Sequence, residues 1–117
     1  VVLGENCFIM ENNVLQYQVR VGNNVTMWSG NHVGHRAVVD DHCFISSHCV
    51  ISGFCHIGSA SFLGVNSTLG DRVKIGRDNL VGAGALITRD TPDGTVVPGA
   101  ASTPSDVSSY RFCRVTP

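Results

Sequence analysis

A six-residue repeat runs without interruption from Leu3 to Pro92 and constrains the fold more than any other feature of the sequence. The first position of every hexad is apolar: Leu3, Ile9, Leu15, Val21, Met27, Val33, Val39, Ile45, Ile51, Ile57, Leu63, Leu69, Ile75, Val81 and Ile87. Such hexads are typical of a parallel β-helix, in which each hexad forms a short strand and a turn and three hexads close one triangular coil. The fifteen hexads therefore predict about five coils, with residues 18 apart stacked on neighbouring coils.

Two further positions of the hexad favour small residues. Glycine follows the apolar residue in eight hexads, and we interpret this as a turn that needs the wide φ range of glycine. Four residues after each apolar residue lies a small or medium side chain that we expect to point inward, and Cys7, Cys43, Cys49 and Cys55 are among these. We interpret the four cysteines as small core residues. A metal site formed by Cys43, Cys49 and Cys55 is disfavoured because they lack the short Cys-x-x-Cys spacing of zinc sites.

The repeat divides the chain into two parts. Residues 1–100 are predicted to form one all-β domain, a single-stranded parallel β-helix, and residues 101–117 a C-terminal tail or cap. We expect residues 105–117 to form a short helix or strand over the last coil, where it would cover the open end. No loop interrupts the hexads, so a functional site must lie on the prism itself. Val1 already lies inside a hexad, and we expect a further segment before it.

Composition excludes several classes of partner. Charged residues make up 15% of the 117 residues and the net charge is -1, so the chain lacks the basic surface that neutralises nucleic-acid phosphates. No apolar run approaches the length of about 18 residues that a membrane span needs, and no signal-peptide pattern is present. These features predict a cytoplasmic protein that binds neither nucleic acid nor membranes.

All five histidines lie in the middle of the chain, at His32, His35, His42, His48 and His56. Imidazole is the natural base near neutral pH, and none of the five occupies an inward position. The repeat places His35, His42 and His48 at turns, pointing outward, and His32 and His56 on strand faces. A lone surface histidine is usually only solvated, but the clustering favours a functional role for one of them.

Two segments, residues 28–35 (WSGNHVGH) and 62–67 (FLGVNS), resemble the hexapeptide-repeat sugar acyltransferases of the PglD and NeuD type. The resemblance covers residues 3 to 100. It implies a left-handed β-helix and an enzyme that transfers an acetyl group from acetyl-CoA to the hydroxyl or amine of a sugar or nucleotide-amino sugar. It also implies a homotrimer with active sites between adjacent prisms, and no metal cofactor.

The same resemblance assigns roles to individual residues. It makes His35 the general base, with His48 as the alternative, and it places the amide of Gly53 against the thioester carbonyl. It assigns Val65 and Ala83 to contacts with the pantetheine arm of CoA, in a groove parallel to the prism axis. The repeat supports the first pair independently, because His35 and Gly53 are 18 residues apart and should stack. A base beside a fixed N–H donor suits acyl transfer, in which a proton is removed while an oxyanion develops.

Three positions differ from what the family or the repeat leads one to expect. Arg36 stands where the family has a glutamate after the catalytic histidine, so the orienting partner of His35 stays open between His32 and Asp41. Phe44 replaces a family histidine that contacts CoA. Trp28 occupies a turn position usually held by glycine, and a trimer contact and a sugar-stacking platform are both compatible with its large ring.

Two other functions are compatible with hexapeptide repeats. One is a non-catalytic trimeric binding or structural protein. The other is a γ-type carbonic anhydrase, in which three histidines bind zinc at the trimer interface. That class has a histidine pair five residues apart, whereas the spacings here are 3, 7, 6 and 8, which makes the assignment less favourable. Stabilisation by acetyl-CoA or by zinc would separate the three classes.

Overall fold

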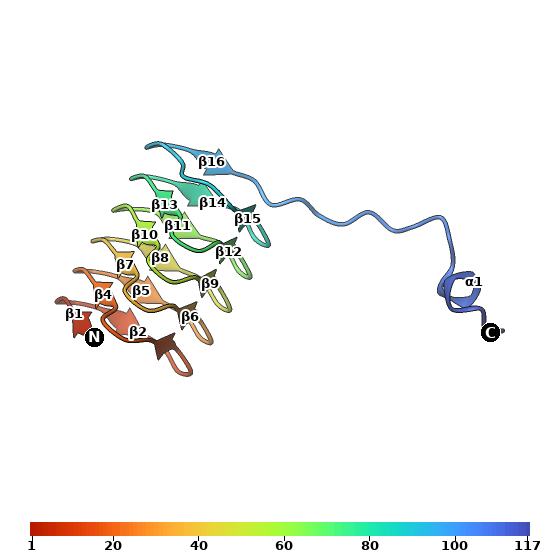
Figure 1. The fold of residues 1–117 in the computed structure, drawn as a ribbon, viewed down its shortest axis with the longest axis horizontal. Helices are drawn as coiled ribbons and strands as arrows, with labels where there is room; N and C mark the ends of the chain where they lie inside the picture. The colour runs from red at the N-terminus through yellow and green to blue at the C-terminus, as the bar shows by residue number, and fades with distance from the viewer.

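The computed structural model describes all 117 residues and contains sixteen two-residue strands and one short helix, α1 (Ser109–Cys113) (Figure 1). Sheet A contains β1 (Val2–Leu3), β4 (Arg20–Val21), β7 (Val38–Val39), β10 (His56–Ile57) and β13 (Lys74–Ile75). Sheet B contains β2 (Phe8–Ile9), β5 (Thr26–Met27), β8 (Phe44–Ile45), β11 (Phe62–Leu63), β14 (Leu80–Val81) and β16 (Val96–Val97). Sheet C contains β3 (Val14–Leu15), β6 (His32–Val33), β9 (Val50–Ile51), β12 (Thr68–Leu69) and β15 (Leu86–Ile87).

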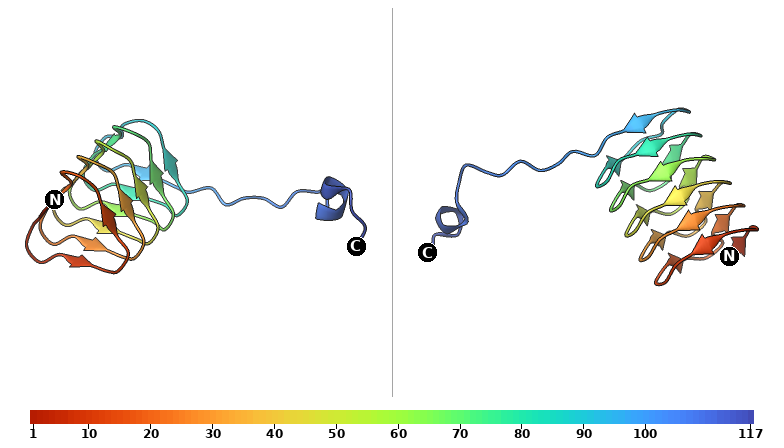
Figure 2. Two further views of the ribbon diagram at one scale, coloured as in Figure 1. Left: turned by 60° about the horizontal axis from the view of Figure 1, so that its bottom comes forward. Right: turned by 180° about the vertical axis from the view of Figure 1, so that it is seen from behind.

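The three parallel sheets form the sides of a triangular prism (Figure 2). Successive strands of the chain belong to sheets A, B and C in turn, and each strand through β12 pairs with the strand 18 residues further on, as Val38 does with His56. The predicted left-handed parallel β-helix of about five coils is confirmed. We call its corners the AB, BC and CA edges, after the two sheets that the turns of each edge connect.

The core is the column of apolar residues that begin the hexads. From Val21 to Ile87 these side chains are buried, and Met27, Ile45 and Leu63 are among the largest that are fully enclosed. The residue before each of them points outward, so every strand contributes one side chain to the core and one to the surface. Burial of this continuous column is the main stabilising contribution to the prism.

The explanation predicted for the repeated glycines was wrong. The left-handed backbone conformation lies two residues later, at positions such as Phe54 (φ 60°) and Ala60 (φ 58°), and not at the glycines that follow the apolar residues. Those glycines are needed for space. A Cβ on Gly34 would lie 2.5 Å from the backbone N of Gly53, because neighbouring coils approach closely at this turn.

The cysteines of the inner column serve as short hydrogen-bond donors. The thiols of Cys43, Cys49 and Cys55 each donate to a carbonyl 15 residues further on, at Sγ–O distances of 3.2, 3.2 and 3.0 Å. Ser61 makes the same contact through its hydroxyl. The three thiols thus serve three different turns, and no group of His, Cys, Asp or Glu side chains is arranged to hold a metal ion. Burial raises the pKa of Cys43 to about 11.

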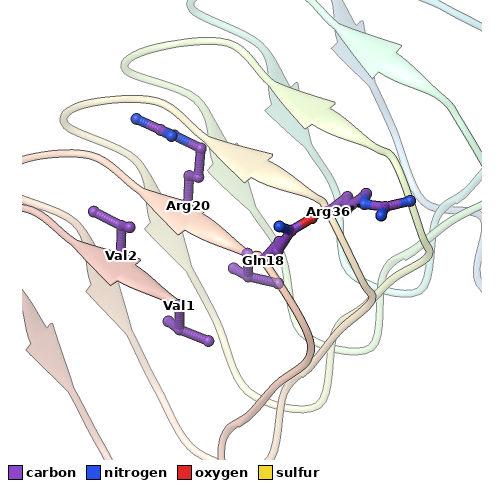
Figure 3. Close-up of a pocket in the computed structure, with 6 residues that line it drawn as sticks. Val1, Val2, Gln18, Arg20 and Arg36 are labelled. Atoms are coloured by element: carbon purple, nitrogen blue, oxygen red, sulfur yellow. Dashed lines mark hydrogen bonds between the residues drawn. The ribbon is translucent and has the colours of Figure 1, made fainter.

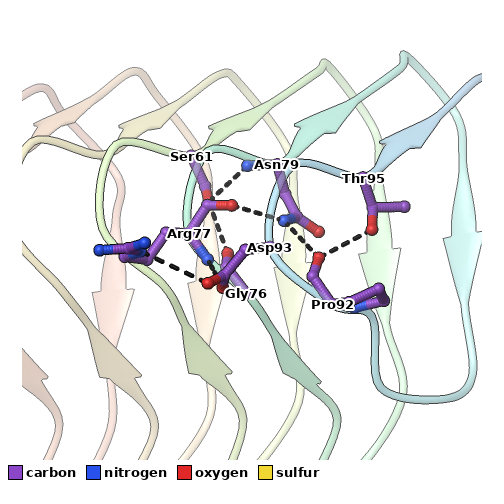
Figure 4. A network of polar contacts seen from close by, with 7 residues as sticks. All are labelled: Ser61, Gly76, Arg77, Asn79, Pro92, Asp93 and Thr95. Carbon is purple, nitrogen blue, oxygen red and sulfur yellow. Dashed lines mark hydrogen bonds and ion pairs between the residues drawn. The ribbon is translucent and has the colours of Figure 1, made fainter.

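The last turn of the AB edge is held by a polar network around Asn79 (Figure 4). The Asn79 side-chain amide donates to the carbonyl of Pro92 at 3.0 Å, and its oxygen accepts a hydrogen bond from Thr91. The backbone N–H of Arg77 donates to the Asp93 carboxylate at 2.9 Å. These contacts attach the last turn of the AB edge to the coil below it.

The C-terminal tail does not cover the last coil, contrary to expectation. The expected helix forms as α1, but it stands apart from the prism at the end of an extended segment, and residues 101–117 are all exposed (Figures 1 and 2). This tail therefore contributes nothing to the core. No helix is long and apolar enough to cross a membrane.

Candidate functional site

His35 and Gly53 meet on the CA edge, as the repeat predicts. His35 lies in the turn after β6 and Gly53 in the turn after β9, one coil further along the prism. A Cβ on Gly53 would lie 2.7 Å from Cε1 and 2.8 Å from Nε2 of His35, so the imidazole ring covers the bare face of this glycine. Gly53 is buried, whereas the His35 side chain is exposed to solvent.

The Gly53 amide has no hydrogen-bond acceptor within the chain. Its N–H donates to no group of the chain, although Gly53 is buried and its carbonyl accepts the N–H of Arg72 at 2.9 Å. Buried backbone N–H groups without an acceptor are rare in folded proteins. A free amide beside an imidazole is the arrangement that stabilises an oxyanion while a proton is transferred.

The exposed His35 ring makes one aromatic contact. Its edge faces the Phe54 ring, with centroids 5.1 Å apart and an interplanar angle of 89°. The backbone N–H of His35 donates to Oε1 of Gln16 at 3.1 Å, and the N–H of Phe54 donates to the His35 carbonyl at 2.9 Å. No side chain hydrogen-bonds either ring nitrogen, so both remain available to a substrate.

Neither residue considered as an orienting partner contacts the His35 ring through a hydrogen bond. Asp41 lies on the AB edge, where Oδ1 accepts the backbone N–H of Asn23 at 2.7 Å. His32 lies on sheet C, in β6, and makes no side-chain hydrogen bond. The contact that the structure shows for the His35 ring is the aromatic one with Phe54.

Arg36 is fixed beside the candidate base. Its Nε donates to Oε1 of Gln18 at 2.9 Å, and its guanidinium lies 5.7 Å from the Tyr17 ring centre and 5.6 Å from the Phe54 ring centre. Figure 3 shows Gln18 and Arg36 together at a surface hollow of about 400 Å³ on the first coils. Sequence reasoning identified Arg36 only as a departure from a family pattern and did not predict these contacts.

Val65 and Ala83 stack on the BC edge, in the turns after β11 and β14. The N–H of Gly84 donates to the Val65 carbonyl at 2.8 Å, whereas the N–H groups of Val65 and Ala83 donate to nothing within the chain. Ala83 also lines a surface hollow of about 470 Å³, together with Leu80 and residues 96–101. Exposed amides beside an open hollow suit a long, thin ligand with amide groups.

His48, the alternative base, belongs to the same edge as Val65 and Ala83. A Cβ on Gly30 would lie 2.5 Å from Nδ1 of His48, so this ring covers Gly30 on the BC edge. His48 is therefore separated from Gly53 by the width of sheet C. Within one chain, the structure pairs His35 with Gly53 and Val65 with Ala83, but it does not bring the two pairs together.

An aromatic ladder runs along sheet B. The Trp28 ring meets Phe44 edge-on with centroids 5.3 Å apart, and Phe44 stacks on Phe62, also at 5.3 Å. Leu80 and Val96 continue this line of outward side chains to the hollow beside Ala83. This ladder was not predicted from the sequence, although the spacing of 18 between Phe44 and Phe62 indicates that their side chains stack.

A second contact missed by sequence reasoning joins His56 and Asp40 on sheet A. Nε2 of His56 lies 2.8 Å from Oδ2 of Asp40, and each side chain is about two-fifths exposed. The two residues are 16 positions apart, because Asp40 follows β7 while His56 lies within β10. A rule that stacks residues 18 apart does not find such a diagonal pair. His42, the remaining histidine, contacts Asn24 on the AB edge.

The sequence pattern of one protein family, described as bacterial transferase hexapeptide (six repeats), matches residues 1–35 and 54–89 of the chain. No curated protein sequence is significantly similar to it.

Solved structures of sugar acetyltransferases share the fold. The acetyltransferase domain of PglB from Neisseria gonorrhoeae FA1090 matches with a TM-score of 0.75 and 27% identity, over 84% of this chain and 51% of that chain. The same domain in complex with acetyl coenzyme A matches with a TM-score of 0.65 and 26% identity, over 83% of this chain and 51% of that chain. PerB from Caulobacter crescentus, in complex with CoA and GDP-perosamine, matches with a TM-score of 0.61 and 26% identity, over 81% of this chain and 54% of that chain.

The chain thus spans about half the length of these solved chains. The resemblance to hexapeptide-repeat sugar acyltransferases that the sequence indicates is confirmed.

Proposed function

Because the chain belongs to the bacterial transferase hexapeptide family, we propose that it transfers an acetyl group from acetyl-CoA to the hydroxyl or amine of a sugar or nucleotide-amino sugar. The observation that carries this proposal is the His35 imidazole lying over Gly53, whose N–H has no acceptor in the chain. The solved relatives that bind CoA or acetyl coenzyme A support the choice of donor.

In the proposed reaction His35 acts as the general base. A ring nitrogen accepts the proton of the acceptor hydroxyl or amine while its oxygen or nitrogen attacks the thioester carbonyl. The carbonyl oxygen becomes an oxyanion and accepts a hydrogen bond from the Gly53 N–H. The carbon–sulfur bond then breaks, and the leaving CoA sulfur takes the proton from His35. The products are an acetylated acceptor and CoA with a free thiol, so no external proton is needed.

Donor binding is proposed for the BC edge. The free amides of Val65 and Ala83 would hydrogen-bond the pantetheine arm, and the hollow beside Ala83 would hold a more distant part of CoA. This edge lies on the far side of sheet C from His35. Donor contacts and base therefore come together only if a second copy of the chain places its BC edge against the CA edge of the first.

A homotrimer of parallel prisms provides this arrangement. In a three-fold ring each CA edge would face the BC edge of its neighbour, and sheet C would line the centre. Sheet C exposes apolar side chains suited to burial, among them Val14, Val50 and Leu86, which are 53%, 39% and 66% exposed. Light scattering at micromolar concentration should report three chains per particle, and a monomer would contradict this site.

Binding of the donor is tested by thermal unfolding with acetyl-CoA and, separately, with zinc. We expect acetyl-CoA to raise the unfolding temperature in the presence of EDTA, because a ligand that binds only the folded state stabilises it. Stabilisation by zinc alone would favour a carbonic anhydrase. No response to either compound would favour a non-catalytic trimeric protein.

Catalysis is tested by following thiol release from acetyl-CoA over a panel of nucleotide amino sugars. His35→Ala should lower the rate by roughly 10²-fold to 10⁴-fold, the usual contribution of a general base. His42→Ala is the matched control, because it removes an exposed turn histidine of the AB edge, which belongs to neither proposed half of the site. His48→Ala tests the alternative base. Equal activity of His35→Ala and the parent would exclude His35 as the base, and loss of activity in His48→Ala alone would transfer the role.

A further inference from the structure

Two arginines of the CA edge are held on one aromatic ring beside the candidate base. The guanidinium of Arg72 lies 4.3 Å from the centre of the Phe54 ring, and that of Arg36 lies 5.6 Å from it. Arg36 comes from the coil before Phe54 and Arg72 from the coil after it, while the His35 ring meets Phe54 edge-on at 5.1 Å. Phe54 thus holds two cations and the imidazole within one small part of the edge.

These cations are oriented but little neutralised. Arg36 has no acidic side chain within ion-pair distance, and its Nε is occupied by the neutral Gln18. Arg72 pairs with Asp71 through Nε at 3.4 Å, which leaves its terminal nitrogens to solvent. A guanidinium fixed through Nε and an aromatic face presents its remaining N–H donors as a fork that matches phosphate or carboxylate oxygens.

The position of the two cations indicates that such an anion belongs to the acyl acceptor and not to the donor, CoA. The phosphates of CoA are separated from the thioester by the whole pantetheine arm, whereas Arg36 and Arg72 converge on the ring that touches His35. An anion bound here lies close to the hydroxyl or amine from which His35 takes a proton. The acceptor is the substrate that can carry an anionic group this near to the acylated position.

We propose that Arg36 and Arg72, held on Phe54, form an anion-binding site for a phosphate or carboxylate group of the acyl acceptor. The identity of the ligand as an acyl acceptor rests on the proposed function. The presence of an anion site at these two arginines does not depend on it. It narrows the acceptor to sugars with an anionic group near the acylated position, such as a sugar phosphate, a nucleotide sugar or an acidic sugar. Phe54 is a positioning residue in this site.

The site is tested by titrating the folded full chain with inorganic phosphate and, separately, with acetate, in the absence of acetyl-CoA. The Nε–Hε resonances of Arg36 and Arg72, assigned through the variants, should shift saturably in nuclear magnetic resonance titrations, and the effect should weaken as salt is raised. The stronger of the two ligands identifies the anion as a phosphate or a carboxylate. Arg36→Gln and Arg72→Gln should each weaken binding by roughly tenfold, as the loss of one charge-assisted contact does.

Arg77→Gln is the matched control. Arg77 pairs with Asp93 at 3.5 Å and Arg72 with Asp71 at 3.4 Å, and both arginine side chains are 67% exposed, but Arg77 lies on the AB edge without an aromatic ring. Binding should be unchanged in Arg77→Gln. Phe54→Leu should weaken phosphate binding, and Phe54→Tyr should restore it, because the tyrosine ring still supports both cations.

Three results would overturn the proposal. The first is the absence of a saturable shift at either arginine, and the second is equal weakening by Arg77→Gln, which would show only general surface charge. The third is displacement of bound phosphate by CoA, which would assign the cations to the donor. Failure of the proposed function differs from failure of the anion site. If the proposed acyl transfer is wrong, acetyl-CoA does not stabilise the protein, whether or not phosphate binds at Arg36 and Arg72.

Discussion

At the scale of single residues, the absence of a side chain at Gly53 sets the position of His35. The imidazole occupies the space that a Cβ would need, with Cε1 at 2.7 Å and Nε2 at 2.8 Å from that point. Gly53→Ala should therefore displace the ring and lower kcat/KM for acetyl transfer by roughly tenfold or more, since small misplacements of a base are costly. Because His35 is exposed and can rotate, the free energy of unfolding should change by less than about 1 kcal/mol.

Gly70→Ala serves as the control for this substitution. Gly70 lies on the same CA edge, and a Cβ there would meet its nearest atom, the Ile87 carbonyl oxygen, at an ordinary 3.5 Å. Steady-state rates and urea unfolding of both variants provide the comparison. Full activity of Gly53→Ala would show that the imidazole need not lie where the structure places it.

The buried thiols make stability depend on alkaline pH. Burial raises the pKa of Cys43 to about 11 from a reference value of 9.0, and it also raises the pKa values of Cys49 and Cys55. The folded protein thus keeps these protons at a pH at which the unfolded chain loses them. The contribution of Cys43 to stability is complete below about pH 9 and is lost as the pH rises through about 11.

Cys43→Ser isolates this effect. The serine hydroxyl can donate to the Gly58 carbonyl as the thiol does, but it does not titrate in this range. We expect the parent to lose more of its free energy of unfolding than Cys43→Ser between pH 9 and pH 11, measured by urea unfolding at several pH values. Parallel pH profiles for the two proteins would contradict the assignment.

At the scale of the turns, one position of the hexad carries the left-handed backbone conformation. Ala60 (φ 58°) is exposed there, and this conformation is strained for any residue with a Cβ. Ala60→Gly should raise the free energy of unfolding by about 0.5 to 1 kcal/mol, because relief of the strain exceeds the added entropy of the unfolded chain. Gly94→Ala should lower it by about 1 kcal/mol, since Gly94 has φ 72° and no atom would obstruct its Cβ.

Urea unfolding of the two variants measures this strain directly. Neither substitution removes or adds a packing contact with the core, so opposite signs of the two changes identify the backbone conformation as the cause. A change of the same sign in both variants would show that the turn position does not control stability.

The regular elements were predictable because a single rule, stacking at 18 residues, describes most of them. The rule yields the pairing of the strands and the contact of His35 with Gly53. It does not yield contacts between residues at different positions of the hexad, such as the His56–Asp40 pair. It also cannot reveal that the glycines are needed because neighbouring coils approach closely, since the rule gives which residues stack and not the distance between their backbones.

The candidate site was predictable only in part for a related reason. Arg36 is an unremarkable surface residue in the sequence, and its restraint by Gln18 and Phe54 depends on side-chain geometry. The separation of Val65 and Ala83 from His35 follows from counting hexads. They are 30 and 48 positions from His35, which is five and eight hexads, whereas residues on the same edge are separated by a multiple of three hexads.

At the scale of the whole molecule, the positions of the two edges bear on how the proposed site is assembled. His35 with Gly53 occupies the CA edge, and Val65 with Ala83 the BC edge, with sheet C between them. A donor that contacts Ala83 and reacts beside His35 in one chain would have to cross a sheet face. Two chains that meet edge to edge remove this conflict, and each chain would contribute one half to each of two sites.

Mixing two inactive variants tests this assembly. His35→Ala removes the base but keeps the donor edge, whereas Ala83→Trp blocks the donor edge but keeps the base. In trimers reassembled from equal amounts of both, about a quarter of all interfaces should combine an intact His35 with an intact Ala83, and the acetyl-transfer rate should recover to about that fraction of the parent, or to about a third in isolated mixed trimers, where one interface of three is intact. Mixed trimers can be isolated through a different affinity tag on each variant, and mixing each variant with a chain that carries both substitutions is the control. Mixed trimers without recovered activity would place base and donor contacts within one chain.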